Sequence, residues 1–262
     1  MPELPDLTLF SRNLKRLFVG QTIEKPVAYN FMKVNAAQPT FETALAGRVL
    51  ADIVREGKEL FFYAEGGGVF AVHLMLGGQF FLSTPAKEES IRGRLFSLQF
   101  ADGRSLCVAD RSNMAKITLN PKKPKSLDVF DPAFTPPHFM KLAQKNVFQG
   151  AKLFLTDQKV MRGIGNAYVD EILWKAEIAP ESIVGKIPEA ALEALYHAII
   201  EVLRWAIDEL ERLTPDAIAG EERSFLKVHV PGRELDENGA KIQVKMIDNR
   251  KTFYTERQKM YR

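Results

Sequence analysis

Hydrophobic residues near the start of the chain recur every three or four positions, the spacing that places side chains on one face of an α-helix. That face would consist of Leu7, Phe10, Leu14, Leu17 and Phe18. Gly20 follows and would end the helix. The pattern therefore predicts an amphipathic helix over residues 3–18 that packs against a core and holds the first residues in place.

From residue 21 to about residue 120 the apolar residues come in short runs broken by Gly and Asp. The runs typical of strands are 49–54, 60–64, 69–74, 80–82, 95–100, 106–108 and 117–119. Turn sequences such as Glu65-Gly66-Gly67-Gly68 and Ala101-Asp102-Gly103 separate them. Several short strands at this spacing predict an antiparallel β-sandwich or barrel.

A segment rich in Pro and Lys over residues 121–137 predicts a domain boundary, and the pattern beyond it becomes helical. Helices are expected over residues 138–145, 167–176 and 189–213, and strands over 241–247 and 252–255 around a turn at Asp248-Asn249-Arg250-Lys251. We expect an α+β protein with three parts. These are an N-terminal helix with an antiparallel β-sandwich, a helical domain and a C-terminal β-hairpin, over residues 1–125, 126–225 and 226–262.

Composition and charge add little to this picture. The chain has 262 residues, 46% of them hydrophobic, and a net charge of +3, which does not by itself establish a nucleic-acid partner. The single Cys107 excludes an intramolecular disulfide and fits a reducing compartment. No secretory or membrane-spanning apolar run is present, so we expect a soluble, intracellular protein without membrane contact, and a monomer.

The first residues, Met1-Pro2-Glu3-Leu4-Pro5-Asp6, carry candidate chemistry. If Met1 is removed, Pro2 presents a free secondary amine. The pKa of an α-amino group is about 7.7–8.0, and partial burial would lower it, so the amine could attack an aldehyde carbon near neutral pH. The neighbouring carboxylate of Glu3 could transfer protons while the carbinolamine and the imine form and break down. An ordinary helix start, with Pro and acidic residues in the first turn, explains the same residues.

A second candidate is the turn Gly163-Ile164-Gly165-Asn166 before a predicted helix. Such a turn leaves backbone N–H groups at a helix N-terminus, where a phosphate can bind. A plain helix-turn-helix corner capped by Asn166 fits the pattern equally well.

Four segments in order carry a resemblance to a known family. They are Pro2-Glu3-Leu4-Pro5-Asp6, Arg55-Glu56-Gly57-Lys58-Glu59-Leu60, His73-Leu74-Met75-Leu76-Gly77-Gly78 and Gly163-Ile164-Gly165-Asn166-Ala167-Tyr168 followed by Asp170-Glu171-Ile172-Leu173. Together they resemble the formamidopyrimidine-DNA glycosylase and endonuclease VIII family of base excision repair enzymes. The resemblance implies a β-sandwich domain with a leading helix, a helix-two-turn-helix domain and a C-terminal finger.

The resemblance also implies an activity on damaged double-stranded DNA. The damaged base would be flipped out of the duplex, the proline amine would attack the sugar C1′, and the resulting Schiff base would lead to strand cleavage by β,δ-elimination. Such a bifunctional glycosylase and abasic-site lyase needs no cofactor, and a bacterial member would work in the cytoplasm, at the nucleoid.

Roles follow for particular residues. The implied catalytic residues are Pro2 as nucleophile, Glu3, Asp6 and Lys58. The implied phosphate contacts are Lys58, His73, Lys152, Asn166 and Arg250. An apolar wedge can fill the gap left by a flipped base, and Leu76 matches the family's wedge position, with Met75 beside it. Met75 could equally be a buried strand end.

The chain departs from the family pattern at the C-terminal finger. Where zinc-binding members have cysteines it has the Leu235 region, Thr255 and Gln258, so a Cys-rich zinc site cannot form and no metal is expected. The hairpin should instead be held by packing, as in zincless-finger relatives. The residues expected to provide it are Val244, Met246, Phe253 and Tyr254.

Three further departures concern activity. Asp6 is one methylene shorter than the family's glutamate. The family's Asp-Pro-Arg-Arg-Phe-Gly, whose Arg and Phe fill the gap in the formamidopyrimidine branch, has become Asp-Arg-Ser-Asn-Met-Ala over residues 110–115. Residues 214–224 are too few for that branch's lesion-capping loop, which favours an endonuclease VIII-like preference for oxidised pyrimidines or ring-opened bases. A catalytically weak lesion-binding protein and a Pro2-dependent tautomerase are the alternatives. Salt-dependent DNA binding would distinguish the tautomerase from the other two.

Overall fold

The computed structural model describes residues 1–262, which form two compact units. The first unit comprises Met1–Pro2, Asp6–Lys123 and Thr214–Glu221, and the second comprises Glu3–Pro5, Pro124–Leu213 and Glu222–Arg262. The break after Lys123 lies in the predicted Pro- and Lys-rich segment. The C-terminal hairpin shares a unit with the helices, and a separate finger over residues 226–262 remains a prediction.

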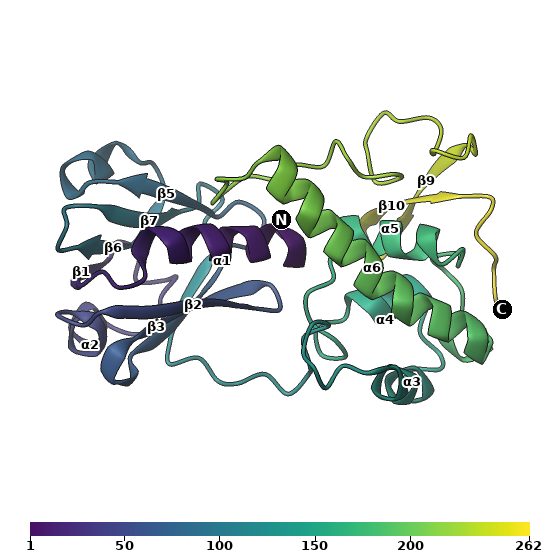
Figure 1. Cartoon of the computed structure of the whole chain (residues 1–262), viewed down its shortest axis with the longest axis horizontal. Helices are drawn as coiled ribbons and strands as arrows, with labels where there is room; N and C mark the ends of the chain where they lie inside the picture. The colour runs from purple at the N-terminus through teal and green to yellow at the C-terminus, as the bar shows by residue number, and fades with distance from the viewer. The chain divides into compact units, whose positions relative to one another are not determined.

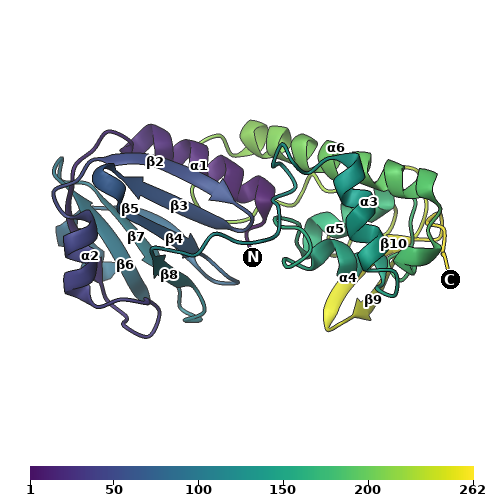
Figure 2. The same cartoon turned by 90° about the horizontal axis from the view of Figure 1, so that it is seen from below.

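The first unit is a β-sandwich of two four-stranded antiparallel sheets, with the strand orders β1-β6-β7-β5 and β2-β3-β4-β8. Figures 1 and 2 show α1 running along the side of this sandwich. Its helices are α1 (Leu4–Phe18) and α2 (Gln38–Leu45), with 3₁₀ turns at Glu65–Gly67 and Pro85–Ser90. Its strands are β1 (Ile23–Ala28), β2 (Leu50–Glu56), β3 (Glu59–Ala64), β4 (Val69–His73), β5 (Gln79–Ser83), β6 (Arg94–Phe100), β7 (Ser105–Ala109) and β8 (Lys116–Leu119).

The predicted face of α1 lies in the sandwich core, where Leu7, Phe10, Leu14 and Phe18 are buried among residues of both sheets. A hydrogen bond from Ser11 Oγ to the carbonyl of Ile53 (2.7 Å) ties the helix to β2. Helix and sandwich are thus confirmed as predicted.

Two elements of this unit were not predicted, β1 and α2. β1 contains Pro26 and two charged residues, which lower its strand propensity. Pro26 is tolerated in this strand because β1 lies at the edge of its sheet and pairs only with β6.

The second unit is helical, with a two-stranded antiparallel hairpin (Figure 1). Its elements are α3 (Pro136–Lys145), α4 (Ala151–Thr156), α5 (Asn166–Lys175), the 3₁₀ turn Val184–Lys186, α6 (Glu189–Leu213), β9 (Ile242–Ile247) and β10 (Arg250–Thr255). The predicted range of the long helix is confirmed, whereas α4 is too short to show a periodic pattern. None of the chain's helices combines the length and the apolarity needed to cross a membrane.

The hairpin differs from the prediction in two respects. Only Asp248 and Asn249, with φ of 48° and 57°, form its turn, and Arg250 begins β10 opposite Ile247. Val244 and Met246 do not hold the hairpin, because they are 55% and 60% exposed.

The buried apolar residues at the hairpin's base are Ile242 and Phe253, which pack with Val228 and against Trp174. Alternation along a strand shows which residues share a face, but not how far along the strand that face is covered.

Candidate active site

The carboxylate of Glu3 lies at the start of α5, inside the second unit. Its Oε1 accepts a hydrogen bond from the backbone N–H of Ala167 (2.9 Å), and its Oε2 accepts one from Tyr168 (3.4 Å). Gly165 makes this approach possible, since a Cβ at that position would collide with Cδ of Glu3. A buried carboxylate is therefore fixed at the positive end of the α5 dipole.

This contact corrects the prediction for the glycine turn. The anion at the N-terminus of α5 is the protein's own Glu3, so the N–H groups of Ala167 and Tyr168 are not available to a phosphate. Asn166 does not cap the helix, whose N-cap is Gly165. Its Nδ2 donates instead to the carbonyl of Lys251 in β10 (3.0 Å).

Met1, Pro2 and Asp6 belong to the first unit. Pro2 is buried, and the α-amino group of Met1 forms an ion pair with Glu221. Asp6 is also buried, on the first turn of α1. Glu221 was not singled out in the sequence, where nothing marks it as a partner of residue 1.

Lys58 and His73 lie together in the first unit. Lys58 occupies the turn between β2 and β3, and His73 ends β4 opposite Lys116 of β8. Burial, aided by the positive charges of Lys58 and Lys116, lowers the pKa of His73 to about 4. Its Nδ1 accepts a hydrogen bond from the N–H of Met75 (3.0 Å), so neutral His73 carries its proton on Nε2.

The predicted wedge lies in the loop that follows β4. Leu76 is 64% exposed, as an inserting side chain must be, and Met75 is half-buried with a positive φ of 53°. Gly77 lets this loop approach Asp110 and Ser112, whose side-chain atoms a Cβ at Gly77 would meet.

Asp110 organises the segment 110–115 beside the wedge. Its carboxylate accepts hydrogen bonds from Ser112 Oγ (2.6 Å) and from the backbone N–H groups of Ser112, Met114 and Ala115 (2.8, 2.7 and 2.8 Å). Burial by itself raises the pKa of Asp110, but these hydrogen bonds outweigh it and hold the pKa below its usual value. The segment is thus fixed in place although its sequence, with Arg111 and no Phe, departs from the family's Asp-Pro-Arg-Arg-Phe-Gly.

The prediction that Lys152 contacts a DNA phosphate is wrong, because Lys152 lies inside the second unit and cannot meet a phosphate at the surface. Its buried Nζ forms an ion pair with Asp170 Oδ1 (2.8 Å) and donates to Thr252 Oγ1 (2.8 Å). Asp170 Oδ2 also accepts from the N–H of Phe253 (2.9 Å) and lies 2.7 Å from His229 Nδ1. Lys152 therefore joins α4 and α5 to the hairpin.

Arg250 remains accessible. Its Nη1 donates to Thr156 Oγ1 at the end of α4 (3.1 Å), and its neighbour Lys251 receives the hydrogen bond from Asn166. The structure thus brings Arg250 and Asn166 to the same part of the second unit, where α4, α5 and the hairpin meet.

Hydrogen bonds connect the finger positions at which cysteines are absent. Gln258 Oε1 accepts from the N–H of Thr255 (2.8 Å), and Gln258 Nε2 donates to the carbonyl of Ile178 (2.9 Å). Next to Leu235, Asp236 accepts from Trp174 Nε1 (2.8 Å) and from backbone groups of its own loop. The chain brings no three His, Cys, Asp or Glu residues together as metal ligands.

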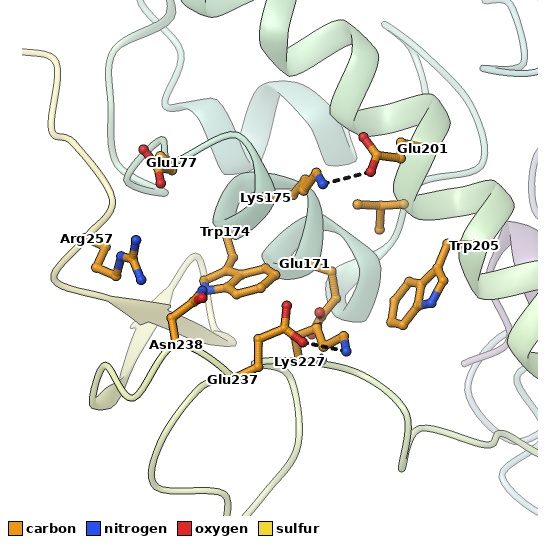
Figure 3. A pocket seen from close by; sticks show the side chains of 11 residues that line it. Glu171, Trp174, Lys175, Glu177, Glu201, Trp205, Lys227, Glu237, Asn238 and Arg257 are labelled. Carbon is orange, nitrogen blue, oxygen red and sulfur yellow. Dashed lines mark hydrogen bonds and ion pairs between the residues drawn. The ribbon is translucent and has the colours of Figure 1, made fainter.

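A cavity of about 460 Å³ lies elsewhere in the second unit, lined by both tryptophans, Trp174 and Trp205 (Figure 3). Two ion pairs, Lys175–Glu201 (2.7 Å) and Lys227–Glu237 (2.6 Å), border it. Each of these lysine charges is paired with a glutamate, and none of the predicted site residues lines the cavity.

Both units correspond to known domains. Residues 1–117 match the formamidopyrimidine-DNA glycosylase N-terminal domain, and residues 126–214 match the formamidopyrimidine-DNA glycosylase H2TH domain. The formamidopyrimidine-DNA glycosylase of Enterococcus faecalis is 31% identical over 217 residues, which cover 79% of this chain and 77% of the relative. That of Lactococcus lactis subsp. cremoris is 28% identical over 269 residues, covering 97% of each.

Solved structures of similar proteins point to the same family. The Lactococcus lactis enzyme bound non-covalently to DNA containing an abasic site matches with a TM-score of 0.86 at 26% identity, over 98% of this chain and 100% of that chain. A complex of MutM with DNA containing carbocyclic 8-oxo-G matches with a TM-score of 0.85 at 26% identity, over the same shares. The chain belongs to the formamidopyrimidine-DNA glycosylase family, which confirms the resemblance and the fold predicted from four motifs.

Proposed function

We propose that this protein is a bifunctional DNA glycosylase and abasic-site lyase of base excision repair, with Pro2 as its nucleophile. The proposal is supported by membership of a glycosylase family and by relatives solved in complex with DNA that contains an abasic site or 8-oxo-G. The observation that carries it is the buried carboxylate of Glu3, which two backbone N–H groups hold directly after Pro2 in the chain.

The chemistry begins when removal of Met1 frees the Pro2 amine. The nitrogen forms a bond to C1′ of the damaged nucleotide while the bond from C1′ to the base breaks, and the base leaves with the bonding electrons and takes up a proton. The nitrogen then loses its proton to a carboxylate, its lone pair opens the sugar ring, O4′ takes up a proton, and an iminium is left. Loss of a C2′ proton expels the 3′ phosphate, and a second elimination expels the 5′ phosphate.

Glu3 and Asp6 are the carboxylates proposed to move these protons. The proposed phosphate contacts are Lys58, His73, Asn166 and Arg250. Neutral His73 would donate a hydrogen bond to a phosphate oxygen through its Nε2–H. Leu76 is the proposed wedge.

We further propose that the enzyme prefers oxidised pyrimidines or ring-opened bases and works at the bacterial nucleoid. The short segment after α6 supports this preference, because it is bound to α1 and does not form a free capping loop. Asn13 Nδ2 donates to the carbonyls of Pro215 (2.9 Å) and Ala217 (2.8 Å).

Borohydride trapping on a duplex with one abasic site tests the mechanism. The protein with its mature N-terminus verified by mass spectrometry should form a covalent adduct at Pro2, and Pro2→Gly and Glu3→Gln should reduce trapping strongly. The matched control is a chain extended by two residues before Pro2, which keeps every side chain but blocks the amine and should give no adduct. Tight lesion binding by the mature protein without any adduct would favour a lesion-binding protein instead.

A further inference from the structure

We propose that Phe31 and Met32, in the loop between β1 and α2, form a second apolar contact with the damaged duplex, beside the Leu76 wedge. They would press against the base pairs that flank the lesion. This inference rests on the proposed function, because its ligand is the same damaged DNA.

Exposure is the first observation behind this inference. Phe31 is 65% exposed and Met32 is 87% exposed, and with Leu76 they are the most exposed large hydrophobic residues of the first unit. Side chains of this size normally lie inside a protein. Three of them on adjacent loops indicate a surface that is covered when a ligand binds.

The loop of Phe31 is bound to the segment 110–119. Asn30 Nδ2 donates to Asn113 Oδ1 (2.9 Å), and the N–H of Ile117 donates to the carbonyl of Lys33 (2.9 Å). Two hydrogen bonds between the side chain of Asn35 and the backbone of Leu119 (2.7 and 3.0 Å) fasten the end of the loop.

The wedge loop flanks the same segment. A Cβ at Gly78 would lie 2.9 Å from Cβ of Ala115, and His73 pairs with Lys116 in the sheet. Residues 110–117 therefore lie next to both loops, with Phe31 and Met32 on one loop and Leu76 on the other. Because backbone and side-chain hydrogen bonds already order these loops, DNA binding would cost little further conformational entropy.

Charge identifies the ligand as a polyanion. Residues 29–36, 74–78 and 110–119 contain Lys33, Arg111 and Lys116, and their one acidic residue, Asp110, is buried and hydrogen-bonded within its own segment. Cations around exposed apolar side chains suit a duplex, whose phosphates meet the cations while its bases meet the apolar groups.

The test compares two duplexes, one with a tetrahydrofuran abasic analogue and one undamaged, and uses the Phe31→Ser/Met32→Ser variant. We expect affinity for the abasic duplex to fall about tenfold, the size typical of a lost aromatic contact to a base. Affinity for the undamaged duplex should change less than twofold, because phosphate contacts dominate it. Phe148→Ser is the matched control, since Phe148 is 92% exposed in the second unit.

A 2-aminopurine base next to the lesion reports the contact directly, and the variant should change its fluorescence in the complex. Equal losses on both duplexes, an equal loss with Phe148→Ser, or a concentration-dependent dimer that the variant abolishes would overturn the inference. So would a wild-type protein that does not bind the abasic duplex. Failure of borohydride trapping with selective binding intact would refute the Pro2 chemistry but leave this inference standing.

Discussion

The two units of the molecule are held together in different ways. In the sandwich, aromatic rings fill the space between the sheets, with Phe62 and Phe70 stacked 4.7 Å apart and Phe70 5.3 Å from Phe96. In the second unit the hairpin is attached by buried polar groups, above all the ion pair between Lys152 and Asp170.

The difference concerns how much each region depends on exact geometry. Apolar packing is non-directional, so a core of this kind tolerates changes that keep its volume. A buried polar network is stable only when every member has a partner. Hydrogen bonds of this kind also hold Thr255 and Gln258 near the hairpin, so the second unit should be the more sensitive of the two regions.

The largest effect is expected from Lys152→Met. Removing the ammonium leaves the buried Asp170 carboxylate without its lysine and with only the contacts to Phe253 and His229, and we expect the second unit to lose about 3–5 kcal/mol of unfolding free energy. Hydrogen exchange of backbone amides in α5 and β10, recorded at increasing denaturant concentrations, measures this loss of stability. Lys175→Met is the control, because its ion pair with Glu201 is exposed and should contribute less than about 1 kcal/mol. Similar losses in the two variants would contradict the assignment.

A smaller effect is expected from Gln258→Leu, which removes the partners of the Thr255 N–H and the Ile178 carbonyl. The expected loss is about 2 kcal/mol, measured by thermal unfolding. Thr255→Val is the matched control, since the buried Thr255 hydroxyl has no hydrogen-bond partner and its removal should be nearly neutral. A chelator should leave both transitions unchanged. A chelator-sensitive transition would show that metal holds the finger.

Phe70→Leu tests the tolerance of the sandwich. The substitution keeps an apolar side chain at a fully buried position but leaves a small cavity, and we expect the first unit to lose about 1.5 kcal/mol. Hydrogen exchange of the backbone amides of β4 at increasing denaturant concentrations measures this loss. A loss as large as that of Lys152→Met would remove the distinction between the two regions.

The last effect concerns pH, and it is confined to acidic conditions. Burial and the charges of Lys58 and Lys116 lower the pKa of His73 from 6.5 to about 4 in the folded protein. The unfolded chain therefore binds more protons between these values, and the first unit should lose stability as the pH falls through this range. NMR titration of the His73 ring should give a midpoint near pH 4, and Lys116→Gln should raise it. A midpoint near 6.5 in the native protein would contradict the burial of His73.

The sequence by itself determined the elements with a strong local pattern. The apolar face of α1 and the stripe along α6 were read correctly because the helical period is set by neighbouring residues. The four motifs taken in order also identified the family. These are properties of short segments, which a single sequence contains in full.

Only the tertiary structure decided which groups meet. Glu3 and Ala167 are separated by 164 positions, so no spacing rule could show that Glu3 occupies the α5 N-terminus in place of a phosphate. Lys152 resembled a surface cation until its partner Asp170 was placed beside it. Local patterns report which face of an element is apolar, whereas burial, ion pairing and long-range hydrogen bonds depend on how the elements pack.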